Sequence, residues 1–157
     1  MQGLGAARGR LAGADVLLIG AGGAGRAIAH ALAGEGLGRL QIVDLDPAAV
    51  AFTADLVNRA AGARIAGPAE TRPGEATVWI NATPIGLRPG DVFPVDLALL
   101  SARTLVADIA SLSRETELLR RARALGCATS DGNDMLNAQI ALIAGFAAGL
   151  EPGEPLS

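Results

Sequence analysis

A glycine-rich turn constrains the fold of this chain more than any other feature. Residues 20–25 read Gly-Ala-Gly-Gly-Ala-Gly and directly follow a continuous apolar run at residues 16–19. Such a run is typical of a strand buried on both faces of a parallel sheet. The spacing Gly-x-Gly-x-x-Gly after that strand is typical of a tight link into a closely packed helix. Together the run and the turn predict an α/β fold.

Apolar runs of strand length alternate with helical stretches along the rest of the chain. We expect strands at residues 16–19, 40–43, 64–66, 77–80, 104–109 and 127–129. We expect helices at residues 24–35 and 47–61, from Ser113 to about 125, and from 134 or 135 to 148. This alternation predicts a doubly wound, mostly parallel sheet with helices on both faces, a Rossmann-like arrangement. Residues 1–150 should form a single domain, followed by a frayed tail at 151–157.

Composition narrows the possible partners. The chain has 157 residues, half of them hydrophobic, which suits one globular domain. A net charge of -3 and a pI of about 5.1 argue against nucleic-acid and anionic-membrane partners. The apolar stretch at 135–150 contains Asn137, Gln139 and Gly145 and is short for a membrane span, so we expect a buried helix there. With a lone Cys127 and no apolar signal at its start, the chain is expected to be cytoplasmic.

Each glycine of the turn has a mechanical purpose. Gly20 permits a tight turn, Gly22 lets the backbone approach a pyrophosphate, and Gly25 lets the helix pack on the strand. Amides of the first helical turn, at the positive end of the helix dipole, then face the phosphates. The alternative is a tight strand-to-helix link in another kind of doubly wound protein. We therefore predict a dinucleotide phosphate site at Gly20, Ala21, Gly22, Gly23, Ala24 and Gly25.

An acidic residue at the end of the second expected strand supports this interpretation. Asp44 lies 19 residues after Gly25, where a carboxylate can accept hydrogen bonds from the adenosine ribose hydroxyls. Its charge would repel a 2′-phosphate, which favours NAD over NADP. The alternative is a solvated carboxylate at a strand end. Asp46, which precedes Pro47, is interpreted as a helix cap.

Three segments resemble one enzyme family. They are the turn at 20–25, the segment Asn81-Ala-Thr-Pro-Ile-Gly86, and the pattern Gly132-x-x-Met135-Leu136-x-x-Gln139. Asp108, Thr116, Leu118 and Leu119 also fit the family's spacing. From about residue 11 to 149 the chain resembles the cofactor-binding half of the shikimate and quinate dehydrogenases. The resemblance implies hydride transfer between a nicotinamide and a cyclic hydroxy acid, in aromatic amino acid biosynthesis.

The resemblance also implies roles for single residues. Asn81, Ala82 and Thr83 should line the nicotinamide-ribose side of the cofactor cleft. Gly132 should let the backbone approach the nicotinamide, and Gln139 should point toward the bound hydroxy acid. Without the resemblance, Asn81 reads as a turn former and Gln139 as a polar residue tolerated on a helix.

The chain departs from the family at a few positions. Ser111 and Ser113 stand where the family usually has Tyr and Pro, which weakens the expected substrate contact and the preset loop. Leu87 replaces a frequent Met, and this change conserves volume. The second strand end, at Asp44, resembles the NAD-using branch, whereas the NADP-using branch typically has Asn-Arg-Thr or a similar sequence there.

The largest departure concerns catalysis. The resemblance implies a preceding substrate lobe with a catalytic Lys/Asp pair, but all thirteen basic residues here are arginine. We therefore assign no catalytic residue, and no spacing suggests a metal site. His30 is expected at the surface and Cys127 in a buried strand, whereas Arg26 can approach the pyrophosphate.

Three functional hypotheses follow from these patterns. The first is the cofactor-binding domain of a shikimate/quinate dehydrogenase-like oxidoreductase, inactive without its substrate lobe, whether truncated or one subunit of a split enzyme. The second is a non-catalytic dinucleotide-binding or interaction module. The third, a lobe of a methylene-tetrahydrofolate or glutamyl-tRNA reductase type, is disfavoured by the Asn81 and Met135/Gln139 motifs. An apolar last helix (Ile140, Leu142, Ile143, Phe146) also predicts a contact with a substrate-lobe polypeptide or self-association.

Overall fold

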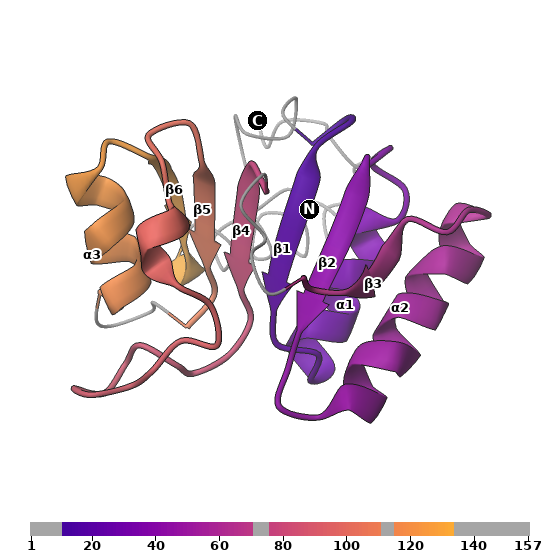
Figure 1. The fold of residues 1–157 in the computed structure, drawn as a ribbon, viewed down its shortest axis with the longest axis horizontal. Helices are drawn as coiled ribbons and strands as arrows, with labels where there is room; N and C mark the ends of the chain where they lie inside the picture. Colours follow the sequence, from indigo (N-terminus) through magenta and orange to yellow (C-terminus); the bar gives the residue numbers. More distant parts are fainter. Residues whose placement is uncertain (1–10, 71–75, 111–114, 134–157) are drawn as a thin grey trace, which may run out of the picture.

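The computed structural model describes residues 11–70, 76–110 and 115–133. Its elements are β1 (Asp15–Ile19), α1 (Gly23–Leu32), β2 (Arg39–Val43), α2 (Pro47–Ala61), β3 (Ala66–Pro68), β4 (Val78–Asn81), the 3₁₀ turn η2 (Leu97–Leu99), β5 (Leu105–Asp108), α3 (Glu117–Ala124) and β6 (Ala128–Asp131). The six strands form one sheet in the order β3-β2-β1-β4-β5-β6, and every adjacent pair is parallel (Figure 1). The predicted Rossmann-like fold is confirmed, with a sheet that is wholly parallel.

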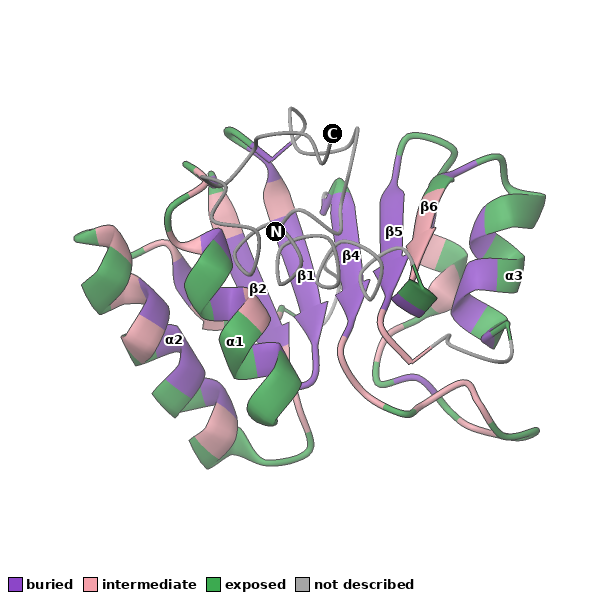
Figure 2. Cartoon of the chain, turned by 180° about the vertical axis from the view of Figure 1, so that it is seen from behind, coloured by how far each residue is buried: buried purple, intermediate pink, exposed green. Residues whose placement is uncertain are grey.

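Alternate residues of the central strands pack on opposite faces of the sheet. Val16 and Leu18 of β1 belong to a core that includes buried residues of α1 and α2. Leu17 and Ile19 belong to a second core that includes the buried residues of α3. Figure 2 shows α1 and α2 in front of the sheet, with β4 and β5 buried along their length and β1 and β2 exposed only in part at their ends. Helices therefore cover both faces, as predicted, and this explains why the residues of β1 are apolar without alternation.

The ends of α2 follow their sequence signals. Asp46 adopts an extended conformation and its Oδ1 accepts a hydrogen bond from the amide of Ala48, at 2.9 Å. Pro47 occupies the first turn, where the missing N–H costs nothing. Gly62 ends the helix with a φ of 64°, a left-handed value that glycine adopts without strain. The predicted cap at Asp46 is confirmed.

Several predicted boundaries are wrong: α1 ends at Leu32 and not at 35, β6 spans Ala128–Asp131 and not 127–129, and the third strand and α3 begin elsewhere. The third strand lies at Ala66–Pro68 and not at 64–66, because Asn58 of α2 accepts hydrogen bonds from the amides of Ile65 and Ala66, both at 2.8 Å, and so fixes where the strand begins. The helix expected to begin at Ser113 is capped instead by Thr116, whose hydroxyl accepts from the amide of Leu119.

Among helices in these described segments, none has the length and apolarity needed to cross a bilayer. The predicted last helix and tail lie outside the described residues.

Candidate functional site

The carboxyl ends of the strands bring the predicted site residues to one edge of the sheet. Ile19 is in register with Val43 on one side and with Asn81 on the other. Asn81 is in register with Asp108, which in turn is in register with Asp131. The strand order reverses between β1 and β4, and open α/β sheets bind ligands in the crevice at such a reversal. Each predicted site element lies just after the end of a strand at this edge: the glycine-rich turn after β1, Asp44 after β2, the turn after Asn81 of β4, and Gly132 after β6.

The glycine-rich turn is packed so closely that two of its glycines have no room for a side chain. Gly20 has a φ of 102°, and a Cβ there would lie 2.6 Å from Cγ2 of Thr83. A Cβ on Gly25 would lie 2.0 Å from the carbonyl oxygen of Gly20. The predicted requirements for a tight turn at Gly20 and for close helix packing at Gly25 are therefore confirmed.

The opposite side of the same turn is open. Neither Gly22 nor Gly23 has any atom within 4 Å of the position that a Cβ would occupy, and Gly22, Gly23 and Ala24 are exposed. The first amide of this helix to bond within it is that of Arg26, which donates to the carbonyl of Gly22 at 2.9 Å. Within the part of the chain that the structure describes, the amides of residues 22–25 have no protein acceptor. Four unpaired donors at a helix N-terminus form a cradle suited to a phosphate group.

Asp44 holds this turn in place as well as lying beside it. Its Oδ2 accepts a hydrogen bond from the amide of Ala21 at 2.7 Å, and its Oδ1 accepts from the amide of Asp46 at 2.9 Å. Ala21 is fully buried and its amide is paired with this carboxylate, and its part in a phosphate site stays a prediction. Asp44 is half-buried, and each carboxylate oxygen keeps lone-pair capacity for a further donor.

The same hydrogen bonds make the protonation of Asp44 depend on folding. The amide of Ala21, and then that of Asp46, lower the pKa of Asp44 below its usual value, against a smaller opposing effect of burial. A pKa lowered by folding adds stability above the unfolded-state value of about 3.9, and this is lost as pH falls through the folded-state pKa. We expect the stability difference between wild type and Asp44→Asn to be largest near neutral pH and to shrink toward pH 3.

Urea denaturation of both proteins from pH 3 to pH 7 measures this difference. Asp91 is a suitable comparison because the amides of Arg88 and Gly86 lower its pKa in the same direction, and these residues follow β4 and do not belong to the glycine-rich turn. Asp91→Asn should therefore show a similar acid dependence without affecting a ligand at the glycine-rich turn. A stability difference for Asp44→Asn that does not change with pH would contradict the assignment.

The side chain of Asn81 makes hydrogen bonds within the turn at residues 81–86. This side chain is fully buried, and Nδ2 donates to the carbonyl of Ile85 at 3.1 Å. Its Oδ1 accepts from both the amide and the hydroxyl of Thr83, at 3.1 and 2.7 Å. The Asn81 side chain is thus hydrogen-bonded within the protein, and the prediction that Asn81, Ala82 and Thr83 line the nicotinamide-ribose side of a cofactor cleft stays a prediction. Ala82 and Thr83 remain half-buried at the sheet edge, where they can contact a ligand.

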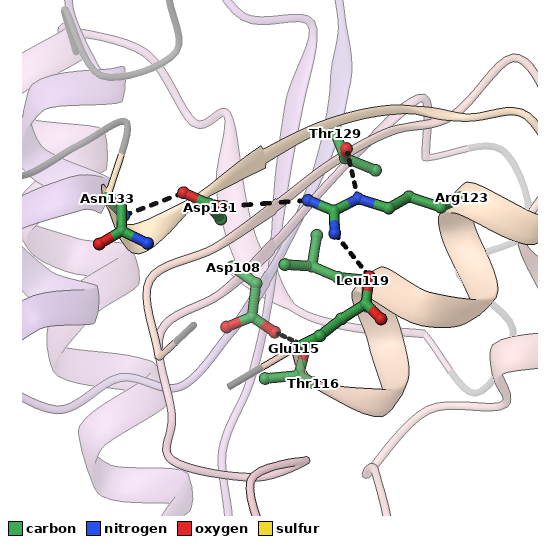
Figure 3. A network of polar contacts seen from close by, with 8 residues as sticks. All are labelled: Asp108, Glu115, Thr116, Leu119, Arg123, Thr129, Asp131 and Asn133. Atoms are coloured by element: carbon green, nitrogen blue, oxygen red, sulfur yellow. Dashed lines mark hydrogen bonds and ion pairs between the residues drawn. The ribbon is translucent and has the colours of Figure 1, made fainter. Parts of the chain in front are cut away.

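A polar cluster continues from Asn81 across β5 into α3 and β6. Asn81 Nδ2 also donates to Asp108 Oδ2 at 3.0 Å, and the hydroxyl of Thr116 donates to the same oxygen at 2.7 Å. Figure 3 shows this carboxylate beside Thr116 at the start of α3, together with Arg123, which reaches Glu115 at 2.5 Å and Asp131 at 3.8 Å. Sequence reasoning assigned no role to Asp108. An acidic residue ending an otherwise apolar strand was the signal that could have indicated one.

The remaining candidate residues lie as follows. Gly132 is buried and follows Asp131, whose Oδ1 accepts from the amide of Asn133 at 3.0 Å. Arg26 donates from Nε to the carbonyl of Ala21 at 3.0 Å, and its guanidinium lies 5.5 Å from the centroid of the Phe52 ring. Arg26 is thus held at the rim of the turn. Gln139, with the rest of the last predicted helix, lies outside the described residues.

Two side chains considered for chemistry have ordinary surroundings. His30 is exposed in the last turn of α1. Cys127 is buried, its thiol donates to the carbonyl of Ser101 at 3.1 Å, and burial raises the pKa of the thiol. A thiol with a raised pKa is a poor nucleophile. Over the described ranges, no group of three or more His, Cys, Asp or Glu side chains could hold a metal ion.

A parallel sheet in this order, with an open amide cradle after β1 and a carboxylate directly after β2, defines a Rossmann-like class of domain. No protein-family model matches the chain. It is 38% identical over 145 residues to a quinate/shikimate dehydrogenase (NAD(+)) of Corynebacterium glutamicum, covering 88% of this chain and 50% of the relative. It is 43% identical over 126 residues to a shikimate dehydrogenase (NADP(+)) of Streptomyces avermitilis, covering 76% of this chain and 43% of the relative.

A comparison with solved structures leads to the same family as the sequence comparison. Quinate dehydrogenase from Corynebacterium glutamicum in complex with NAD superposes with a TM-score of 0.81 at 34% identity, covering 96% of this chain and 55% of that one. By sequence and by fold, the chain is a relative of the shikimate and quinate dehydrogenases and matches the C-terminal, cofactor-binding portion of those enzymes. It spans about half the length of the relatives it matches.

Proposed function

We propose that this chain binds a nicotinamide dinucleotide across the carboxyl edge of its sheet, as the cofactor-binding part of a shikimate/quinate dehydrogenase-like oxidoreductase. The observation that carries the proposal is the set of unpaired amides at residues 22–25, in a turn that is open at Gly22 and Gly23 and is held by Asp44 at the strand-order reversal. A dinucleotide spans such a reversal, with one nucleotide half on each side.

The residues present fit such a ligand. Amides of residues 22–25 would hold the pyrophosphate, where the missing side chains of Gly22 and Gly23 leave room. The free lone pairs of Asp44 would accept from the adenosine ribose, and Ala82, Thr83 and Gly132 would border the other half. When bound, the nicotinamide ring supplies or accepts a hydride. The proton of the reacting alcohol needs a separate base, and this chain has no lysine to act as one.

NAD is the proposed preference over NADP. Asp44 is half-buried, and its lowered pKa keeps the carboxylate charged at neutral pH, where it repels a 2′-phosphate. Calorimetric titration of the purified chain with each cofactor tests the proposal. We expect NAD to bind more tightly than NADP by about tenfold or more, the factor that corresponds to one unfavourable charge contact. Equal or tighter binding of NADP would remove the proposed preference, and binding of neither cofactor would remove the function itself.

Catalysis is proposed to need a second polypeptide lobe. The relatives are about twice as long as their match to this chain, and the absence of lysine leaves the proposed hydride transfer without its usual base. The purified chain should therefore bind cofactor without reducing it in the presence of quinate or shikimate. Adding the preceding half of the Corynebacterium glutamicum relative in trans should restore turnover. Continued inactivity despite a demonstrated complex would favour the non-catalytic binding module.

A further inference from the structure

A buried carboxylate lies directly behind the turn that follows β4. Asp108 has 1% of its surface exposed and is in register with Asn81 on the neighbouring strand. Its Oδ2 accepts from Asn81 and Thr116, and its Oδ1 accepts from the amide of Ala110 at 2.9 Å. A buried charge is costly unless its surroundings are organised around it, so this arrangement indicates a function for the carboxylate.

The contacts of Asp108 lead to the predicted cofactor edge in short steps. Asp108 fixes the amide of Asn81, and the carbonyl end of that same side chain holds Thr83 through two hydrogen bonds. The hydroxyl of Thr83 in turn accepts from the amide of Ile85 at 3.1 Å. The methyl group of Thr83 packs on the backbone of Gly20 so closely that a Cβ there would overlap it. One buried carboxylate thus sets the position of a half-buried residue beside the phosphate cradle.

The position of this network relative to the strand-order reversal determines which part of a ligand it would affect. Asp44 and the phosphate cradle lie on the side of β1 and β2, whereas Thr83 lies on the side of β4. A dinucleotide that spans the reversal places its second nucleotide half over β4. Resting on the proposed function, we infer that Asp108 is a positioning residue for the nicotinamide half of the cofactor, acting through Asn81 on Ala82 and Thr83.

Two ligands separate this role from a general effect on folding. ADP contains the adenosine and pyrophosphate parts but lacks the nicotinamide riboside, so its binding reports on the cradle and Asp44 alone. NAD contains both halves. If Asp108 positions only the β4 side, its substitution should weaken NAD binding while ADP binding stays nearly constant. A purely structural loss would weaken the two ligands in parallel.

Asp108→Asn is the appropriate first variant. It keeps the size of the side chain, but its amide nitrogen must face at least one of the donors that now share the carboxylate, whichever way the amide is turned. We expect the dissociation constant for NAD to rise by about tenfold or more and that for ADP to change by less than about twofold. The matched control is Asp96→Asn, because Asp96 accepts the amide of Ala98 at 2.8 Å near η2, before the start of β5. Asp96→Asn should leave both constants unchanged.

A second pair of variants tests the inference if Asp108→Asn does not fold. Thr116→Val removes the hydroxyl that donates to Asp108, whereas Thr116→Ser keeps it. The ratio of the NAD and ADP dissociation constants should rise for Thr116→Val and stay at the wild-type value for Thr116→Ser. Equal ratios in these two variants, or parallel loss of NAD and ADP binding in Asp108→Asn, would overturn the inference. Failure of the wild-type chain to bind either ligand would instead overturn the proposed function on which it rests.

Discussion

Substituting Gly25 by alanine is expected to destabilise the domain more than any other single methyl addition in the turn. The new Cβ would lie 2.0 Å from the backbone carbonyl oxygen of Gly20, and a backbone atom cannot rotate away as a side chain can. The start of α1 must therefore move off β1, which costs about 3 kcal/mol or more, at the upper end of overpacking effects. For a chain of this size the melting temperature should fall by about 6 to 12 °C, as measured by thermal denaturation followed by circular dichroism.

Gly23→Ala is the matched control for this substitution. Gly23 belongs to the same turn of the same helix, but the position of its Cβ has no atom within 4 Å and the residue is exposed. Its stability should stay unchanged or rise by up to about 1 kcal/mol, because alanine loses less backbone entropy in a helix. If Gly25→Ala were as stable as Gly23→Ala, the close approach of α1 to β1 would be contradicted.

Replacing Asp44 by alanine is expected to have the largest effect on ligand binding. The buried amide of Ala21 would lose its acceptor, and the cradle that it borders would lose its anchor to β2. The carboxylate proposed to accept from a ribose would be lost as well. Charge-assisted hydrogen bonds of this kind are worth about 1.5 to 3 kcal/mol, so the dissociation constant for NAD should rise by about 10- to 150-fold. Calorimetry at neutral pH measures the change.

Asp46→Ala serves as the control because Asp46 is an exposed carboxylate only two residues away. It caps α2 through the amide of Ala48, so its loss should cost about 1 kcal/mol of stability. NAD affinity should stay within about threefold of wild type, since the side chain makes no contact with the cradle. The variant Asp44→Asn should in addition reduce the difference between the dissociation constants for NAD and for NADP. If Asp44→Ala and Asp46→Ala weakened NAD binding equally, the special position of Asp44 would be contradicted.

The structure places the predicted site residues in two groups. Gly20 and Gly25 have the packing purposes that their spacing predicts, because those purposes depend on local geometry alone. The hydrogen bonds of Ala21 and Asn81 were not predicted, because each involves a residue supplied by another part of the chain, Asp44 in one case and Asp108 in the other. A motif shows which residues follow one another, but it does not show which of them will be buried and hydrogen-bonded by other parts of the chain.

The sequence by itself determined the fold class, the strand that begins it, the turn that follows and the cap of α2, because hydrophobic periodicity, glycine spacing and helix caps act over a few residues. Only the tertiary structure decided which turn amides stay unpaired, where the third strand and α3 begin, and that Asp108 lies behind Asn81. Those outcomes depend on parallel register between strands that are 27 residues apart in the case of Asn81 and Asp108. Register is set by the packing of both sheet faces at once, which no short segment encodes.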